Sequence, residues 1–267
     1  MTPSLRLAAL GSSYAAGPGI TPVLDRSAMR SGANYAHVAA RILGADLTDL
    51  SVSGATTATI LTESQQTWDG TLVAPQIEGL PADADVVTLT AGGNDLGYIG
   101  AVFSAAAGAD PDSTLASVTE STTESTTGSA AAPAVDDAAI SATAAGLIDV
   151  VTRIDDRAPR ARIVLVDYLP LFGPATRAGR DVPFDDDVLT TLRALQAAVE
   201  EAFGRAADET GVELLAASEL GRGHELGSSE AWVSGVLEGM NAVGGSFHPN
   251  AVGMAAVGRA LAELLQL

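Results

Sequence analysis

The sequence of 267 residues contains no cysteine and no lysine. The absence of cysteine excludes disulfides, thiolate metal sites and a thiol nucleophile. All 14 basic residues are arginines, and none lies between Arg41 and Arg153. With a formal net charge of −19, the chain lacks the clustered basic surface that binding to phosphates requires. We therefore expect neither nucleic acid nor an anionic membrane surface as a partner.

Long apolar runs and a recognisable leader are also missing. No run approaches the ~20 consecutive apolar residues that span a bilayer, so we expect no stable membrane insertion. Residues 1–10 lack the basic start, apolar stretch and cleavage site of a signal peptide. We expect a cytoplasmic protein, because the lack of cysteine also fits a reducing compartment. A secreted protein whose leader has been trimmed is the alternative.

What the sequence does contain is an alternation of short apolar runs with helical patterns. Such alternation predicts a parallel sheet covered by helices on both faces. We therefore expect a three-layer α/β/α sandwich with a central five-stranded parallel sheet, formed by residues 1–267 as a single domain. The predicted strands are residues 5–10, 46–52, 86–90, 163–166 and 212–215, and the clearest predicted helices are residues 34–43, 185–203 and 250–265.

Residues 104–137 differ from the rest of the chain in composition. They are rich in alanine, serine, threonine and aspartate and offer little apolar surface to bury. We interpret this low-complexity segment as a mobile surface excursion of the domain. A short helix that forms one wall of a cleft is the alternative.

Two turns at the ends of the first two predicted strands contain candidate catalytic groups. Ligands of open parallel sheets bind beyond the carboxyl ends of the strands. Ser13 follows the first strand, where it is a candidate nucleophile, although serines in such turns more often only cap a helix. Gly54 follows the second strand and can bring a bare backbone N–H close to a substrate oxygen. The lack of lysine argues against the other interpretation of the first turn, a phosphate-binding loop.

The third strand and the last helix add two more candidates. Asn94 follows the third strand, where its amide and nearby backbone N–H groups can form an oxyanion hole. His248 lies just before the Pro-Asn start of the last helix and is the candidate general base. Of the two other histidines, His224 lies in a glycine-rich stretch that favours a structural hydrogen bond. His37 lies in a predicted helix, which favours a packing role.

In chain order these candidates are Ser, Gly, Asn and His, and the sequence resembles the SGNH hydrolase superfamily, also called the GDSL family. The resemblance covers nearly the whole chain and is greatest to the actinobacterial and fungal esterase-lipase branch. It implies a flavodoxin-like fold and a serine ester hydrolase of the carboxylesterase or lipase type, acting on a small-molecule ester without metal or other cofactor. The implied roles are an acyl-enzyme on Ser13, a general base at His248, and an oxyanion hole formed by the N–H groups of Ser13 and Gly54 with the Asn94 amide.

Two positions depart from the family pattern. Ser12 replaces the aspartate of Gly-Asp-Ser, and Gly245 replaces the aspartate that normally orients the histidine. Three arrangements remain open at the second position. The backbone carbonyl of Gly245 accepts the Nδ1 proton of His248, a carboxylate from residues 230–238 takes that role, or catalysis is weak or lost. We favour the first, a Ser-His dyad.

Other functions use the same residues or the same fold. Hydrolysis of acetylated sugars or of thioesters is the nearest variant of the leading hypothesis. A catalytically degenerate SGNH-fold binding protein is a second class, favoured by the loss of the aspartate at position 245. A flavodoxin-like nucleotide or flavin binder is a third class, in which Asn94 and His248 have no natural role.

Overall fold

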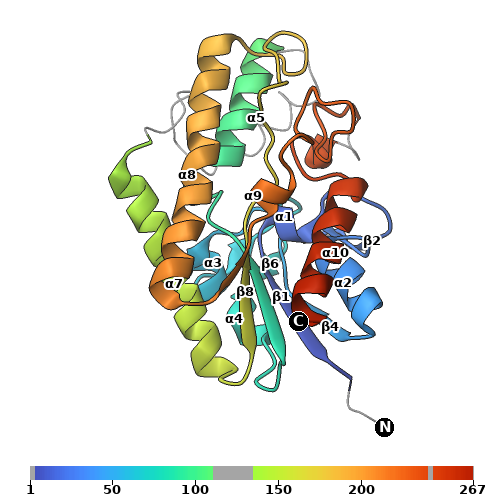
Figure 1. The fold of residues 1–267 in the computed structure, drawn as a ribbon, viewed down its shortest axis with the longest axis vertical. Coiled ribbons are helices and arrows are strands. Elements are labelled where there is room, and N and C mark those ends of the chain that lie inside the picture. Colours follow the sequence, from blue (N-terminus) through green and yellow to red (C-terminus); the bar gives the residue numbers. More distant parts are fainter. Residues whose placement is uncertain (1–3, 111–134, 240–242, 267) are drawn as a thin grey trace.

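A five-stranded parallel sheet forms the centre of the computed structural model, which describes residues 4–110, 135–239 and 243–266 (Figure 1). All four strand pairings are parallel. The three-layer fold expected from the sequence is confirmed. In spatial order the strands are β4 (Asp46–Asp49), β1 (Arg6–Gly11), β7 (Val86–Thr90), β8 (Arg162–Val166) and β9 (Glu213–Leu215).

Two pairs of helices cover the two faces of this sheet (Figure 1). The helices α2 (Tyr35–Leu43) and α10 (Ala251–Gln266) pack on each other on one side. The long helices α7 (Asp137–Arg157) and α8 (Asp186–Thr210) pack on each other on the opposite side. Within the described residues the remaining helices are α1 (Ser13–Ala16), α3 (Thr57–Leu61), α4 (Gln76–Gly79), α5 (Tyr98–Ala109), α9 (Ala217–Leu220) and the short 3₁₀ turn η1 (Val243–Gly245).

The starts of the three predicted helices are set by capping side chains. Asn34, Asp185 and Asn250 each accept a hydrogen bond from the backbone N–H three residues further on. Such a bond satisfies one of the free N–H groups at a helix start. Each predicted helix therefore begins at its cap, one residue before the first helical residue. Helix α8 continues to Thr210, seven residues beyond the predicted end at residue 203.

Other boundaries differ from the prediction. The second strand ends at Asp49 rather than at residue 52, although the N–H groups of Leu50 and Val52 still donate to carbonyl oxygens of β1. Helices α5 and α7 were not predicted, although α7 buries residues at helical spacing, among them Ile140, Leu147 and Ile154. Residues 104–109 of the low-complexity segment belong to α5. Residues 111–134 of that segment lie outside the described residues.

Two small hairpins follow strands β1 and β4 in the chain. The first pairs β2 (Val23–Asp25) with β3 (Arg30–Ser31), and the second pairs β5 (Gln65–Gln66) with β6 (Leu72–Val73). The hairpins are joined at their tips. The Trp68 indole N–H donates to the Arg26 carbonyl at 2.9 Å, and the Ser27 hydroxyl donates to the Asp69 carboxylate at 2.8 Å.

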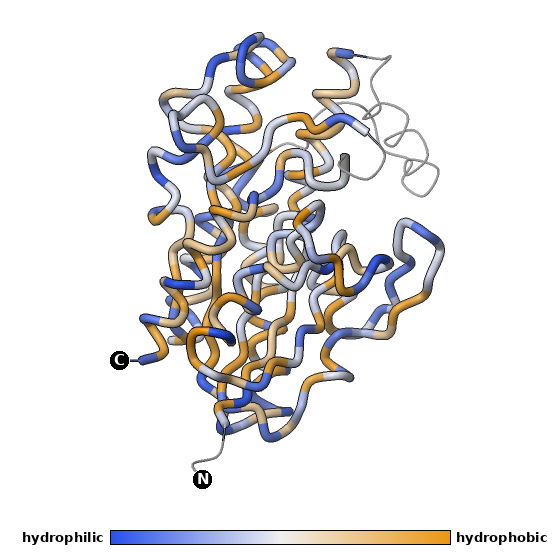
Figure 2. The backbone as a smooth tube through the Cα atoms, turned by 90° about the vertical axis from the view of Figure 1, so that its right-hand side faces the viewer, coloured by the Kyte–Doolittle hydropathy of each residue, from blue (hydrophilic) through white to orange (hydrophobic). Residues whose placement is uncertain are grey.

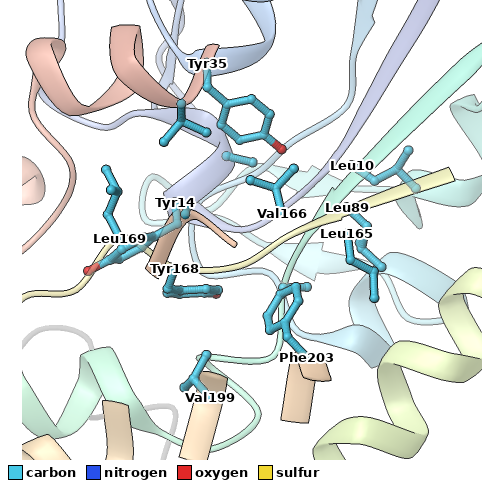
Figure 3. Close-up of a cluster of buried hydrophobic side chains, with 14 of the residues drawn as sticks. Leu10, Tyr14, Tyr35, Leu89, Leu165, Val166, Tyr168, Leu169, Val199 and Phe203 are labelled. Atoms are coloured by element: carbon cyan, nitrogen blue, oxygen red, sulfur yellow. The ribbon is translucent and has the colours of Figure 1, made fainter. Parts of the chain in front are cut away.

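The core lies on both faces of the sheet. Along the central strands the chain is mainly hydrophobic, whereas the outer helices alternate between hydrophobic and hydrophilic residues (Figure 2). All five residues of β7 are buried, as expected for a strand covered on both faces. Tyr168 contacts the rings of Tyr14 and Phe203, with centroid distances of 4.3 and 6.1 Å (Figure 3). No helix in the described parts of the chain is long and apolar enough to span a membrane.

Candidate active site

The fold brings Ser13 and His248 into direct contact, although 235 residues separate them in the sequence. Ser13 is the first residue of α1, immediately beyond the carboxyl end of β1. His248 lies in the turn that precedes α10. The Nε2 atom of His248 is 2.8 Å from Oγ of Ser13. Both side chains are nearly buried, with 6% of Ser13 and 4% of His248 exposed.

The turn before Ser13 depends on Gly11 and on a buried glutamine. Gly11 has a φ of +149°, and a Cβ atom there would lie 2.3 Å from the carbonyl oxygen of Thr90. Only glycine therefore permits this close approach to β7. The buried Gln76 side chain accepts from the Gly11 N–H at 2.8 Å and donates to the Gly11 carbonyl at 2.9 Å. These two hydrogen bonds fix the chain two residues before the nucleophile.

Ser12 connects the first motif with the third. Its N–H donates to the Thr90 carbonyl at 2.8 Å. Its hydroxyl lies 2.8 Å from the Tyr168 hydroxyl, which also accepts the Gly93 N–H at 3.2 Å. The serine that replaces the family aspartate is therefore fully buried and hydrogen-bonded.

The His248 ring is oriented by the carbonyl of Ser246, not by that of Gly245. Nδ1 of His248 lies 2.7 Å from the Ser246 carbonyl oxygen. A backbone carbonyl faces Nδ1, as predicted, but it belongs to Ser246 and the prediction of Gly245 is wrong. Phe247 has a φ of 55°, a left-handed conformation that is uncommon for a side chain of this size. This turn directs the carbonyl two residues before the histidine, rather than three, toward the ring.

The carboxylates of residues 230–238 do not take this role. Glu230 uses its backbone carbonyl to accept a hydrogen bond from His224, and Glu238 is exposed. Gly245 is also crowded, because a Cβ atom there would lie 3.0 Å from the Pro18 carbonyl oxygen. An aspartate side chain at position 245 would therefore require this turn to shift.

Burial controls the protonation of the base. Burial lowers the pKa of His248 to about 4, although the hydrogen bond to the Ser246 carbonyl acts in the opposite direction. At neutral pH the ring is therefore uncharged. Because Nδ1 faces a carbonyl acceptor, we assign its proton to that nitrogen. Nε2 then has a free lone pair directed at the Ser13 hydroxyl.

Three N–H donors were predicted to form the oxyanion hole. The N–H groups of Ser13 and Gly54 donate to no other described residue, as expected for the first residue of a helix in the case of Ser13. The Asn94 amide donates one of its two N–H groups to the Ala55 carbonyl at 2.8 Å. Asn94 thereby contacts the turn that contains Gly54.

The two other histidines have structural surroundings. The His224 ring stacks on Trp232 at a centroid distance of 3.8 Å, and its Nδ1 lies 2.7 Å from the Glu230 carbonyl. The predicted structural hydrogen bond of His224 is thus confirmed. His37 lies in α2, 3.6 Å from the carboxylate of Asp49. Across the described ranges, no three histidine or acidic side chains gather as a metal site would require.

Two supporting residues were missed by the sequence analysis. Tyr168 follows strand β8 almost directly, so its place at a strand end was a usable signal. Gln76 gave no such signal, because it lies 65 residues from Gly11 and in a short helix.

Asp167 is also buried, and burial raises its pKa to about 6. Its carboxylate accepts from the N–H and hydroxyl of Ser218.

Similar solved structures define the class of fold. A phospholipase A1 from Streptomyces albidoflavus NA297 matches with a TM-score of 0.72 at 20% sequence identity. An extracellular lipase from Streptomyces rimosus matches with a TM-score of 0.69 at 23% identity. Both matches cover 99% of this chain and 100% of the other chain. The chain therefore shares the fold of these two Streptomyces enzymes.

The sequence comparisons define the family. The family model described as GDSL-like Lipase/Acylhydrolase matches residues 9–256. Lipase 2 of Streptomyces coelicolor is 34% identical, over 94% of this chain and 83% of that protein. The chain belongs to the GDSL-like lipase/acylhydrolase family, and it is an SGNH-type hydrolase of the lipase and esterase class.

Proposed function

We propose that the protein hydrolyses small-molecule carboxylic esters through an acyl-enzyme on Ser13, with His248 as general base. The observation that carries this proposal is the 2.8 Å contact between His248 Nε2 and Ser13 Oγ. The contact lies in a nearly buried site, and the Ser246 carbonyl holds the ring from its other side. The similarity to Lipase 2 of Streptomyces coelicolor supports an ester substrate.

The reaction takes place in two halves. Ser13 Oγ bonds to the ester carbonyl carbon while its proton passes to His248 Nε2. The tetrahedral intermediate collapses, the bond to the alcohol oxygen breaks, and His248 returns the proton to the departing alcohol. A water molecule then attacks the acyl-enzyme and gives its proton to His248. The second collapse releases the carboxylic acid and restores the Ser13 hydroxyl.

The negative charge of each intermediate is held by N–H donors. We assign this role to the N–H groups of Ser13 and Gly54 and to the second amide hydrogen of Asn94. The first two groups have no acceptor among the described residues, so a substrate oxygen meets no competitor for them. Removing one such donor typically costs about 3 kcal/mol of transition-state stabilisation.

A dyad is sufficient for this chemistry. The Ser246 carbonyl fixes the tautomer and orientation of the imidazole, which is part of what a carboxylate does in a triad. It carries only a partial negative charge and stabilises the imidazolium less. The same dyad also serves for acetylated sugars and thioesters, which differ in the leaving group and not in the attacking one.

Hydrolysis of p-nitrophenyl acetate and p-nitrophenyl butyrate tests the proposal. We expect turnover by the wild type and a loss of at least about 1,000-fold in Ser13→Ala. Ser4→Ala is a matched control, because it removes an exposed hydroxyl before the other end of β1. We expect Asn94→Ala to lower kcat by about 100-fold or more with little change in KM. Full turnover by folded Ser13→Ala would refute the assignment of the nucleophile.

A further inference from the structure

A side chain outside the four motifs contacts the turn that contains Gly54. Nε2 of Gln65 donates a hydrogen bond to the Ser53 carbonyl oxygen at 2.7 Å. The Ser53 N–H donates to the Ala28 carbonyl at 3.0 Å. Both backbone polar groups of Ser53 therefore have partners, one from each of the two small hairpin regions. Gln65 is half-buried, whereas its neighbour Gln66 is exposed.

The Ser53 carbonyl and the Gly54 N–H belong to the same peptide group. In a planar trans peptide these two groups point in opposite directions. A hydrogen bond that fixes the Ser53 oxygen therefore also fixes the direction of the Gly54 N–H. That N–H donates to no other described residue, so nothing among those residues holds it from its own side.

Gly54 makes this external support important. Its φ of +83° lies in the left-handed region, and glycine occupies both signs of φ with similar ease. The chain itself therefore opposes rotation of the Ser53–Gly54 peptide only weakly. Hydrogen bonds to the peptide must decide which way the N–H points.

Gln65 is well anchored for such a role. It lies in β5 and pairs with Val73 of β6. The same hairpin is joined to the neighbouring one by the bond from the Trp68 indole to the Arg26 carbonyl. The backbone at Gln65 is therefore held by its pairing with β6 and by the bond between the tips of the two hairpins.

We propose that Gln65 is a positioning residue, which holds the Ser53–Gly54 peptide with the Gly54 N–H directed at the developing oxyanion. This inference rests on the proposed function, because it assigns a support to one of its three donors. Gln65 itself does not contact the reacting atoms. Its effect is therefore expected on the transition state rather than on ground-state binding.

The test compares Gln65→Glu with Gln66→Glu in the full chain. The first variant keeps the shape of the side chain but replaces the N–H donor with a carboxylate oxygen facing a carbonyl. The second makes the same change of charge one residue further along the same strand, on an exposed side chain. For Gln65→Glu we expect kcat to fall about 10- to 100-fold with KM changed less than about twofold. For Gln66→Glu we expect both values within about twofold of the wild type.

A boronic acid inhibitor supplies a readout that a structural role would not move. It forms a tetrahedral adduct with the serine, so its inhibition constant should rise by about the same factor as kcat falls. Gln65→Leu, which removes the donor without adding charge, should show the same pattern. Thermal unfolding of all variants checks that the fold is retained.

Each outcome decides the question. Wild-type kcat and boronate affinity in folded Gln65→Glu and Gln65→Leu would overturn the inference while leaving the proposed function intact. Equal losses in the Gln65 and Gln66 variants would also overturn it, because the effect would then come from charge or stability. Ser13→Ala is measured in the same series. If the wild type shows no turnover that depends on Ser13, the proposed function fails, and the role of Gln65 falls with it.

Discussion

The turn that carries Ser13 and the loop that carries His248 are held in place by different means. Ser13 follows a strand with a neighbour on each side, β4 and β7. Its turn is held by two hydrogen bonds between the Gln76 side chain and the Gly11 backbone. A third bond joins the Ser12 N–H to the Thr90 carbonyl of β7. His248 lies outside the sheet. Its backbone carbonyl accepts the Ser234 N–H at 2.9 Å, and a single antiparallel bridge joins Val233 to Pro249.

This difference separates the costs of disturbing each region. The Ser13 turn is continuous with the core. Loss of a side chain that bonds to this turn therefore leaves buried polar groups without a hydrogen-bond partner. The His248 loop pairs with residues 232–235 and reaches the core through the fully buried Phe247. A change at His248 itself therefore alters the geometry of catalysis before it alters the core. Substitutions near Ser13 should therefore lower stability most, and substitutions near His248 should lower activity most.

Removal of the base is expected to give the largest effect. His248→Ala should lower kcat/KM at least about 1,000-fold, because Ser13 then has no group to accept its proton. His224→Ala is the matched control, since that ring stacks on Trp232 and bonds the Glu230 carbonyl instead. Steady-state kinetics with circular dichroism of both variants checks this. A greater loss of activity in His224→Ala would require the base to be reassigned.

The pH dependence of kcat/KM should reveal the burial of His248. Catalysis requires the neutral ring, and burial lowers its pKa to about 4. The acidic limb is therefore expected near pH 4. At pH 5 about 90% of the activity would remain, against about 3% for an exposed histidine of pKa 6.5.

The same pKa predicts the direction of the stability change. Between pH 6.5 and 4 the unfolded chain binds a proton at His248 that the folded chain does not. The free energy of unfolding should therefore decrease as the pH falls through this window. Below pH 4 the titration of His248 causes no further decrease. An acidic limb near pH 6.5 would show that the ring is open to water in solution.

Loss of the glutamine beneath Ser13 should act mainly on stability. Gln76→Leu leaves the buried N–H of Gly11 without a partner, whereas the Gly11 carbonyl still accepts the Val52 N–H at 3.0 Å, so we expect a cost of about 2 kcal/mol. The midpoint of thermal unfolding should fall by about 4–8 °C. Gln66→Leu, an exposed glutamine, should leave the midpoint almost unchanged. If Gln76→Leu keeps the wild-type midpoint, the supports of the two regions do not differ as described.

Restoration of the family aspartate should give the smallest effect. Gly245→Asp places a side chain 3.0 Å from the Pro18 carbonyl oxygen, so we expect a loss of about 1–2 kcal/mol of stability. The Ser246 carbonyl already occupies the position beside Nδ1, so kcat/KM should not rise. An increase in kcat/KM would show that the loop can reorganise to seat a carboxylate.

The site was predictable from sequence to the extent that its groups follow secondary structure. Ser13 and His248 each lie at the end of a strand or the start of a helix, and they were identified because the four motifs together resemble the SGNH family. The structure places the two side chains 2.8 Å apart. Gly245 was the wrong carbonyl, because the choice depends on the left-handed turn at Phe247. Nothing in the local pattern of a phenylalanine indicates such a conformation.

The side chains that hold the catalytic turns could not be predicted from the sequence for a similar reason. Gln76 and Gln65 bond to backbone atoms 65 and 12 residues away. A glutamine in a short helix or hairpin looks the same in sequence whether it is solvated or buried against a turn. Only the packing of distant segments determines which glutamine bonds to the backbone of a catalytic turn.

By itself, the sequence determined the alternation of strands and helices, the helix starts at their caps and the four candidate groups. Apolar periodicity and capping act over a few residues, so they can be interpreted directly from the chain. The tertiary structure decided the strand order, which places β1 between β4 and β7, and the carbonyl that orients His248. It also decided which glutamine side chains, Gln76 and Gln65, bond to the catalytic turns. These features depend on contacts between segments far apart in the chain, and such contacts form only when the whole core packs together.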